Sequence, residues 1–321
     1  MIISCPAMNT FLDQIALATP LFVLVFLGYA LMRFFHWPKA MSDHMTRFVF
    51  SVALPAMLFR LMSDFSKLPS VDVRLLIAFF GGCLVVFIMG RLIAWRIFQL
   101  DGVGQSVFAL GGVFSNNVML GLPLAKVALG EAAVPSVALV LVFNSLILWT
   151  LVTVSVEWAR HGSFSVHGFA KAVRAVLLNP IVAGILSGTL FGLIGLPLPT
   201  LIDQPITMLS QAATPLALIA LGMGLTEYRL RDDWRISLAI CAVKLLIQPL
   251  VVWLLARLLG LGALETQVVV LLASLAVGAN VYLMSRQFET LEGPVAGSLI
   301  LSTALAALTT PLALTLMMVI A

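Results

Sequence analysis

The sequence predicts an all-α membrane protein of ten transmembrane helices, arranged as two inverted repeats of five helices each. Composition is the first observation behind this prediction, because 61% of the 321 residues are hydrophobic and only 10% are charged. Soluble domains carry about 25% charged residues. Length is the second, because each span needs roughly 20 apolar residues, which leaves room for about ten spans. An internal repeat is the third. We expect neither a soluble domain nor a cleaved signal peptide, because no positively charged region precedes the first apolar run.

The apolar runs place the ten spans along the chain. They are expected at residues 15–35, 43–63, 72–97, 103–128, 132–157, 172–194, 201–226, 234–259, 265–286 and 292–320. The longest connection, residues 159–171, would divide the chain into a first repeat at 1–158 and a second repeat at 172–321.

Short similar stretches recur at nearly one offset in the two halves. Pro20 and Pro180 begin similar stretches in spans 1 and 6, and Pro55 and Pro215 begin similar stretches in spans 2 and 7. Because each half holds an odd number of spans, the second copy must be inverted in the membrane. We expect Pro55 and Pro215 to kink their spans and to form a scaffold wall opposite the substrate.

Positive charges predict the orientation of the chain. Lysines and arginines are concentrated in the connections that follow the odd-numbered spans, for example at Arg33, Arg96 and Arg160. Cytoplasmic loops of membrane proteins carry this excess. We therefore expect a multi-pass protein of the cell inner membrane, with a cytoplasmic central loop and both termini outside.

The predicted fourth span is interrupted by polar and helix-breaking residues. It contains Ser115, Asn116 and Asn117, followed by Gly121 and Pro123. Glycine and proline weaken or break a helix, and in hydrocarbon a broken helix is tolerated only where it is buried or lines a cavity. The fourth span is therefore predicted to be unwound and to face a substrate.

A weaker version of this pattern lies in the predicted ninth span, where Gly278, Asn280 and Tyr282 occur close together. Asn117 and Asn280 fall at matching positions of the two repeats. Gly278 allows local unwinding. Paired interruptions in the two halves of a membrane protein indicate a transport site.

Amide side chains at these interruptions suit a carboxylate ligand. Asn116, Asn117 and Asn280 offer N–H donors, and the start of a half-helix adds backbone donors for an anion. The alternative is that these amides join neighbouring helices. Ser115 and Tyr282 could donate to a ligand or cap local backbone.

Three further polar side chains lie inside predicted spans. Lys244 and Gln248 are four residues apart and so share a helical face, where they could bind the second carboxylate of a dicarboxylate. The alternative is a structural lysine bonded to backbone carbonyls, because a charge inside the membrane needs protein or water around it. Asn144 is a further candidate for lining the cavity.

Several functions are disfavoured by what the sequence lacks. All acidic residues lie near span ends or in loops, which argues against a buried proton relay. The cysteines have no metal or disulfide spacing, and no cofactor or nucleic acid is expected. A sodium ion held by backbone carbonyls and uncoupled transport both stay open. A membrane-embedded sensor or enzyme without transport activity is the alternative class, although no catalytic motif occurs.

Four stretches carry a family resemblance. Leu54–Phe59 (Leu-Pro-Ala-Met-Leu-Phe) and Phe114–Pro123 are similar to signatures of the auxin efflux carrier family of membrane transport proteins, as are Asn179-Pro180 and Pro215–Met223. Bacterial members of that family include proteins named as malonate and other organic-acid permeases. The plant PIN auxin exporters are distant relatives.

The resemblance implies an architecture and a mechanism. Spans 1, 2, 6 and 7 would form a scaffold and dimer domain, and spans 3–5 and 8–10 an elevator-like transport domain. Broken spans 4 and 9 would cross, with an asparagine from each meeting the substrate carboxylate. The hypothesis is thus a homodimeric secondary transporter for a small carboxylate, such as malonate or an auxin-like acid.

Two departures from the family pattern bear on the interruptions. Val118 stands where a small residue is usual, and the proline commonly found near Ala276 is absent. We therefore expect span 9 to be less sharply broken than span 4.

Overall fold

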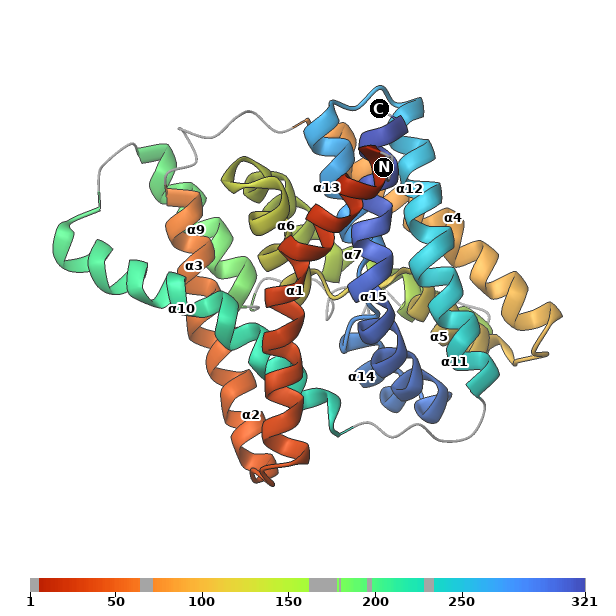
Figure 1. Cartoon of the computed structure of the whole chain (residues 1–321). Helices are drawn as coiled ribbons and strands as arrows, with labels where there is room; N and C mark the ends of the chain where they lie inside the picture. Colours follow the sequence, from red (N-terminus) through yellow and green to blue (C-terminus); the bar gives the residue numbers. More distant parts are fainter. Residues whose placement is uncertain are drawn as a thin grey trace, which may run out of the picture.

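The chain forms a helical bundle in a computed structural model that describes residues 6–63, 72–161, 178, 180–194, 198–227 and 234–320 (Figure 1). Those ranges contain helices and one isolated antiparallel bridge, between Ser115 and Val277, but no strand. Most of the predicted central loop, from residue 162 onward, lies outside the described ranges, and so does Asn179.

The α-helices follow one another in the order expected from the apolar runs. They are α1 (Pro6–Arg33), α2 (Lys39–Phe48), α3 (Leu54–Ser63), α4 (Arg74–Arg96), α5 (Gly102–Val113), α6 (Leu122–Leu129), α7 (Val134–His161), α9 (Pro180–Ile194), α10 (Thr200–Leu225), α11 (Trp234–Ala242), α12 (Gln248–Leu258), α13 (Ala263–Ser274), α14 (Asn280–Gln287) and α15 (Glu292–Ile320). Two π-helical insertions are η3 (Asn117–Gly121) and η5 (Val243–Ile247).

Six helical stretches of the described chain are long and apolar enough to cross a membrane. They are Lys39–Ser63, Arg74–Arg96, Glu131–Arg160, Thr200–Leu225, Trp234–Leu258 and Glu292–Met317. Shorter apolar helices supplement them at Thr19–Arg33, Gly102–Val113, Asn117–Leu129, Pro180–Ile194 and Ala263–Ser274. The prediction of an all-helical protein with several membrane spans is therefore confirmed, whereas the inverted repeat stays a prediction.

A π-helical turn precedes each of three X-Pro pairs. These turns are η1 (Val49–Ala53) before Pro55, η3 before Pro123 and η5 before Pro249. Proline has no N–H to donate, so the regular hydrogen-bond ladder cannot continue through it. The preceding residue instead bonds five positions back, as Leu54 does to the carbonyl of Val49. The prolines in these helices thus widen a turn while the helix goes on.

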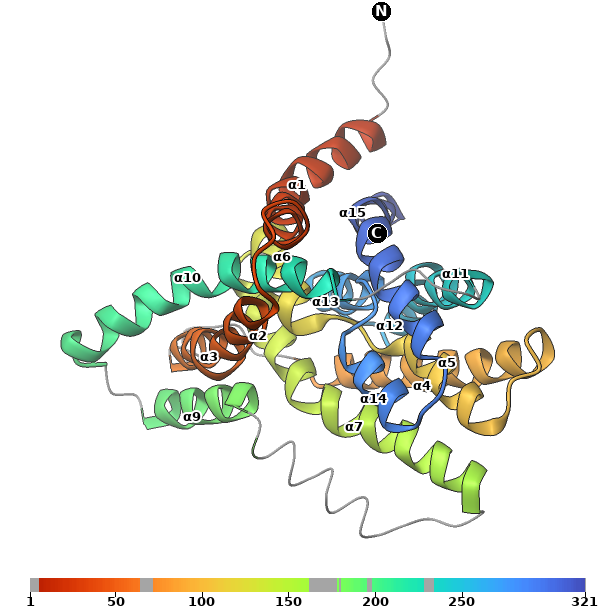
Figure 2. The same cartoon turned by 90° about the horizontal axis from the view of Figure 1, so that it is seen from below.

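Two groups of helices lie on opposite sides of the molecule (Figures 1 and 2). One side holds α3, α9 and α10, and the other holds α4, α5, α11 and α12. Helix α1 begins and helix α15 ends at the same end of the bundle (Figure 1).

Glycines bring α1 into close contact with α10, and α3 into close contact with α9. A Cβ atom at Gly28 of α1 would overlap the carbonyl oxygen of Ile219 in α10, and one at Gly222 would overlap that of Val25. Helices α3 and α9 pack in the same way, because a Cβ at Gly184 would lie 2.6 Å from the oxygen of Pro55. Small residues at helix contacts are the usual basis of tight packing in membranes, so these two helix pairs are closely packed.

Candidate functional site

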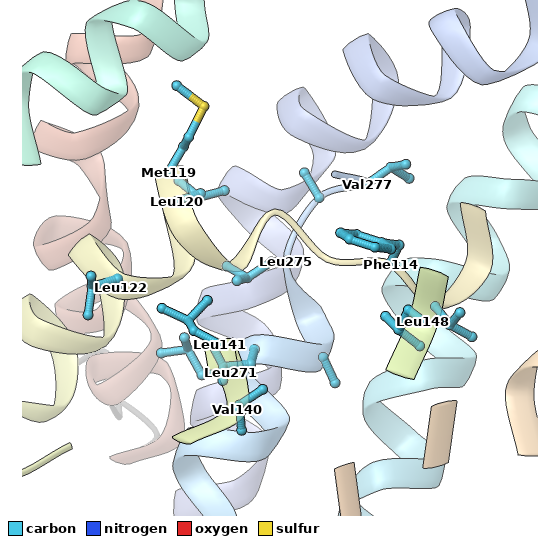
Figure 3. Close-up of a cluster of buried hydrophobic side chains, with 14 of the residues drawn as sticks. Phe114, Met119, Leu120, Leu122, Val140, Leu141, Leu148, Leu271, Leu275 and Val277 are labelled. Atoms are coloured by element: carbon cyan, nitrogen blue, oxygen red, sulfur yellow. The ribbon is translucent and has the colours of Figure 1, made fainter. Parts of the chain in front are cut away.

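Two interrupted helices meet near the middle of the bundle. Helix α5 ends at Val113 and η3 begins at Asn117, while α13 ends at Ser274 and α14 begins at Asn280. Figure 3 shows the extended segments around Phe114 and Val277 running next to each other.

The two extended segments satisfy each other's backbone groups. The N–H of Asn116 donates to the carbonyl of Ala276 at 2.9 Å, and the N–H of Gly278 donates to the carbonyl of Phe114 at 2.8 Å. Unpaired backbone groups are costly in a membrane interior. Each interruption is therefore stabilised by the other, and we call this pair of segments, residues 114–116 and 275–279, the crossing.

The expectation that the second interruption is the weaker one was wrong. It leaves five residues, 275–279, outside a helix, whereas the first leaves three, 114–116. Gly121 ends η3 and Pro123 lies in the first turn of α6, inside the continuous helical stretch Asn117–Leu129 and therefore outside the interruption itself. Hydrogen bonds across the crossing, rather than a proline, interrupt the second helix.

Gly278 is the residue that lets the segments approach. A Cβ atom at this position would lie 3.0 Å from both the carbonyl oxygen of Ser115 and the ring of Phe114. The predicted role of Gly278 at the interruption therefore has a steric basis.

A cavity of about 490 Å³ lies beside the crossing. Of the residues predicted from the sequence, it is lined by Ser115, Asn116, Asn117, Asn144, Gly278 and Asn280. It extends from Phe50 of η1 (Val49–Ala53) along α2 to Ser42, and from Ala220 of α10 to Glu227, two residues beyond that helix. The cavity therefore runs from the crossing towards the end of the bundle where α2 begins and α10 ends.

Amides from two elements meet at the cavity. Asn117 Nδ2 donates to Asn144 Oδ1 at 3.2 Å, and the two residues are 1% and 4% exposed. The Asn117 Oδ1 and the Ser115 Oγ are buried and have no hydrogen-bond partner within the described residues. Buried polar atoms normally have partners, so these two atoms suit contact with a bound molecule or water.

Two helical N-terminal ends face the same cavity. Asn117 is the first residue of η3, and Asn280 is the first residue of α14. The first N–H groups of a helix lack partners within the helix and carry partial positive charge. Several of these groups already have partners here, because the N–H groups of Asn117, Val281 and Tyr282 donate to the carbonyls of Ser115, Gly278 and Ala279. The partial positive charge of the two ends, together with the amide side chain at the first position of each, can still attract an anion.

Lys244 and Gln248 lie away from the cavity, which corrects the idea that they meet a second carboxylate. Both are fully buried. The Lys244 Nζ donates to the carbonyl of Ala273 at 2.5 Å, and Gln248 Nε2 donates to the carbonyl of Val113 at 2.9 Å. This geometry agrees with the alternative given in the sequence analysis, a structural lysine bonded to the backbone.

Several other predicted residues are also absent from the cavity lining. Tyr282 lies in the first turn of α14, and Gly121 and Pro123 lie in η3 and α6. Pro55 packs against Gly184 of α9, and Pro215 lies inside α10. The wall opposite the crossing is made instead by residues that include Phe50, Ala220 and Leu221.

One cation, Arg47, lines the cavity and is not among the site residues predicted from the sequence. Arg47 of α2 lines the outer part of the cavity, is exposed, and forms no ion pair within the described ranges. Glu227, which also lines the cavity, forms an ion pair with Lys39 at 3.2 Å. The available signal was the composition of α2, because Lys39–Phe48 and Asn280–Gln287 are much more polar than the other described α-helices.

Helices that cross a membrane and unwind beside a polar cavity are typical of membrane transporters. The comparison with protein families agrees with this class. The family model described as "Membrane transport protein" matches residues 15–314, and the chain belongs to that family. The resemblance to the auxin efflux carriers is thereby confirmed, and the chain is a transporter rather than an enzyme.

Two relatives are similar over nearly the whole chain. A protein of Rhizobium meliloti (strain 1021) named "Putative malonate transporter" is 26% identical over 298 residues, which cover 91% of this chain and 92% of the relative. An uncharacterised transporter of Methanocaldococcus jannaschii is 25% identical over 297 residues, which cover 88% of this chain and 91% of the relative.

Proposed function

We propose that the protein is a secondary transporter that binds a small organic anion at the crossing. The observation that carries this proposal is the meeting of two helical N-terminal ends, each beginning with an asparagine, at one cavity. Asn117 and Asn280 would donate amide hydrogens to the substrate carboxylate, and Asn116 and Ser115 would add polar contacts. Asn144 would orient Asn117 through the hydrogen bond between their side chains.

A small carboxylate is the substrate class that this site favours, with a dicarboxylate such as malonate as the first candidate. The name of the Rhizobium meliloti relative specifies malonate. The cavity of about 490 Å³ falls within the range of about 300–1,000 Å³ typical of small-molecule sites. An auxin-like aromatic acid is the competing substrate, because Phe50, Phe114 and Met119 give the cavity apolar surface.

The proposed mechanism is elevator-type alternating access. The close-packed α1, α3, α9 and α10 would serve as the scaffold and as the contact of a homodimer. The helices that carry the crossing would move against this scaffold with the substrate. The cavity runs towards the end of the bundle with Arg33, Lys39 and Arg47, which the distribution of positive charge assigns to the cytoplasm. The described conformation would then be open to the inside of the cell, with both termini outside the inner membrane.

Two five-helix inverted repeats would account for the pairing of the interruptions. The interrupted α5–η3 and α13–α14 segments would occupy equivalent places in the first and second repeat. The close glycine contacts of α1 with α10 and of α9 with α3 join two helix pairs that such a repeat would make equivalent.

A ligand-stabilisation screen tests the substrate class. The melting temperature of the purified full-length protein is measured with malonate, succinate, acetate and indole-3-acetate, against sodium sulfate at equal ionic strength. We expect one or more carboxylates to raise the melting temperature and sulfate to leave it unchanged. No stabilisation by any carboxylate would contradict the proposal.

Transport is separated from sensing by reconstitution. Proteoliposomes preloaded with the stabilising carboxylate should accumulate the same radiolabelled compound by exchange. Binding without any exchange would favour the membrane sensor over the transporter.

A further inference from the structure

Two helices, α5 and α13, end at the crossing. Carbonyl groups at their C-terminal ends accept hydrogen bonds from side chains of neighbouring helices. Gln248 Nε2 donates to the last residue of α5, Val113, at 2.9 Å. At the end of α13, Lys244 Nζ donates to Ala273 at 2.5 Å and Thr310 Oγ1 donates to Ser274 at 2.9 Å. The N-terminal ends at the cavity carry no comparable side-chain caps.

Lys244 is the only cation of this set. Its side chain is 0% exposed, and it forms no ion pair with a carboxylate in the described part of the chain. A charge buried in this way is expensive unless it meets opposite charge. The C-terminal end of a helix carries about half a negative charge, and the Lys244 Nζ is hydrogen-bonded to that end of α13.

The side-chain nitrogen of Lys244 lies where other transporters with interrupted helices bind a cation. Unwound carbonyls and the C-terminal ends of half-helices are the groups that coordinate sodium in such proteins. Here the carbonyl of Ala273 already accepts a hydrogen bond from a side chain of the protein, that of Lys244. A fixed cation cannot exchange with bulk solution, so a sodium gradient cannot act through this end of the crossing.

We propose that Lys244 is a positioning residue whose ammonium takes the place of a coupling cation at the C-terminal end of α13. The charge holds α13 against η5 and so fixes the crossing, and the protein needs no sodium there. The consequence for transport rests on the proposed function. The cation replacement itself does not, because it can be measured without any substrate.

The test measures melting of the purified full-length protein in sodium chloride and in choline chloride at equal ionic strength. The wild type should melt at the same temperature in both salts and should bind no radioactive sodium. Lys244→Ala leaves space and an unpaired carbonyl, so it should melt several degrees lower in choline chloride and regain part of that loss in sodium chloride. Lys244→Met fills the space without charge, so it should be destabilised equally in both salts.

Lys126→Ala is the matched control, because Lys126 pairs with Glu131 at 2.9 Å at an exposed helix end. It should behave as the wild type in both salts. Sodium-specific stabilisation of the wild type would overturn the proposal, and so would a folded Lys244→Ala variant that shows no response to sodium. If Lys244→Ala does not fold, binding of radioactive sodium to the wild type decides the question. A failure of the carboxylate screen would leave each of these results unchanged.

Discussion

The backbone N–H of Gly278 donates to the carbonyl oxygen of Phe114 at 2.8 Å, across 164 positions of sequence. Together with the bond from Asn116 to Ala276, it replaces the helical hydrogen bonds that both segments lose. Neither interruption would be stable alone in hydrocarbon. The site therefore exists only when both halves of the chain have folded against each other.

Gly278→Ala should damage both stability and binding. The added methyl group would lie 3.0 Å from the Ser115 carbonyl oxygen and from the Phe114 ring, which forces the two segments apart. We expect a lower melting temperature and a weaker stabilisation by malonate in the same assay. Gly81→Ala is the control, because its new methyl group would meet only the Leu255 side chain at 3.7 Å. Equal behaviour of the two variants would show that close approach at Gly278 is unimportant.

Gly222→Ala should destabilise the scaffold without touching the crossing. The new methyl group would overlap the carbonyl oxygen of Val25 in α1, and overpacking of this kind typically costs about 1–3 kcal/mol. Thermal melting measures the loss. Gly224→Ala on the same helix should melt as the wild type does, because nothing lies within 4 Å of its new methyl group. A wild-type melting temperature for Gly222→Ala would contradict the tight α1–α10 contact.

Arg47→Gln should slow the entry of an anionic substrate. Arg47 lines the outer part of the cavity and is exposed, so its contribution is long-range and screened by salt. We expect the initial rate of malonate uptake into proteoliposomes to fall roughly 2- to 5-fold at low ionic strength, since an exposed charge pair contributes about 0–1 kcal/mol. The difference should shrink at high salt.

The control for Arg47 is Arg96→Gln, because Arg96 ends α4 and stacks on Trp95 away from the cavity. Its uptake rate should equal that of the wild type at every salt concentration. A loss of rate in Arg47→Gln that does not depend on salt would reject the electrostatic role.

Residue types within single apolar runs were enough to predict the crossing. The partners of residues that bond to distant parts of the chain could not be predicted in this way. Glycines and amides inside apolar runs locate Ser115, Asn117 and Asn280 without knowledge of the fold, and all three line the cavity. The partners of Lys244 and Gln248 lie 29 and 135 positions away. Helical spacing shows that these two side chains share a face but not which carbonyls that face meets.

The length of the second interruption and the contribution of α2 to the cavity were not predicted, because both depend on contacts between distant parts of the chain. A proline is a local cause of helix breaking, so its absence near Ala276 suggested a milder break. The actual cause is hydrogen bonding to Phe114 and Asn116 in another part of the chain. Likewise, Arg47 could be recognised as a positive charge at a span end, but its position at the cavity depends on how α2 packs against α10.

Binding of radiolabelled malonate to purified Asn117→Ala and Asn280→Ala tests the central claim most directly. Loss of one amide bond to a carboxylate should weaken binding by about 1.5–3 kcal/mol, which is roughly 10- to 150-fold in Kd. Ser187→Ala is the control, because Ser187 is exposed on α9 and bonds only to carbonyls of its own helix. The account predicts saturable binding to the wild type and the control, and strongly weakened binding to both asparagine variants that still melt cooperatively. Wild-type affinity in both asparagine variants would contradict it.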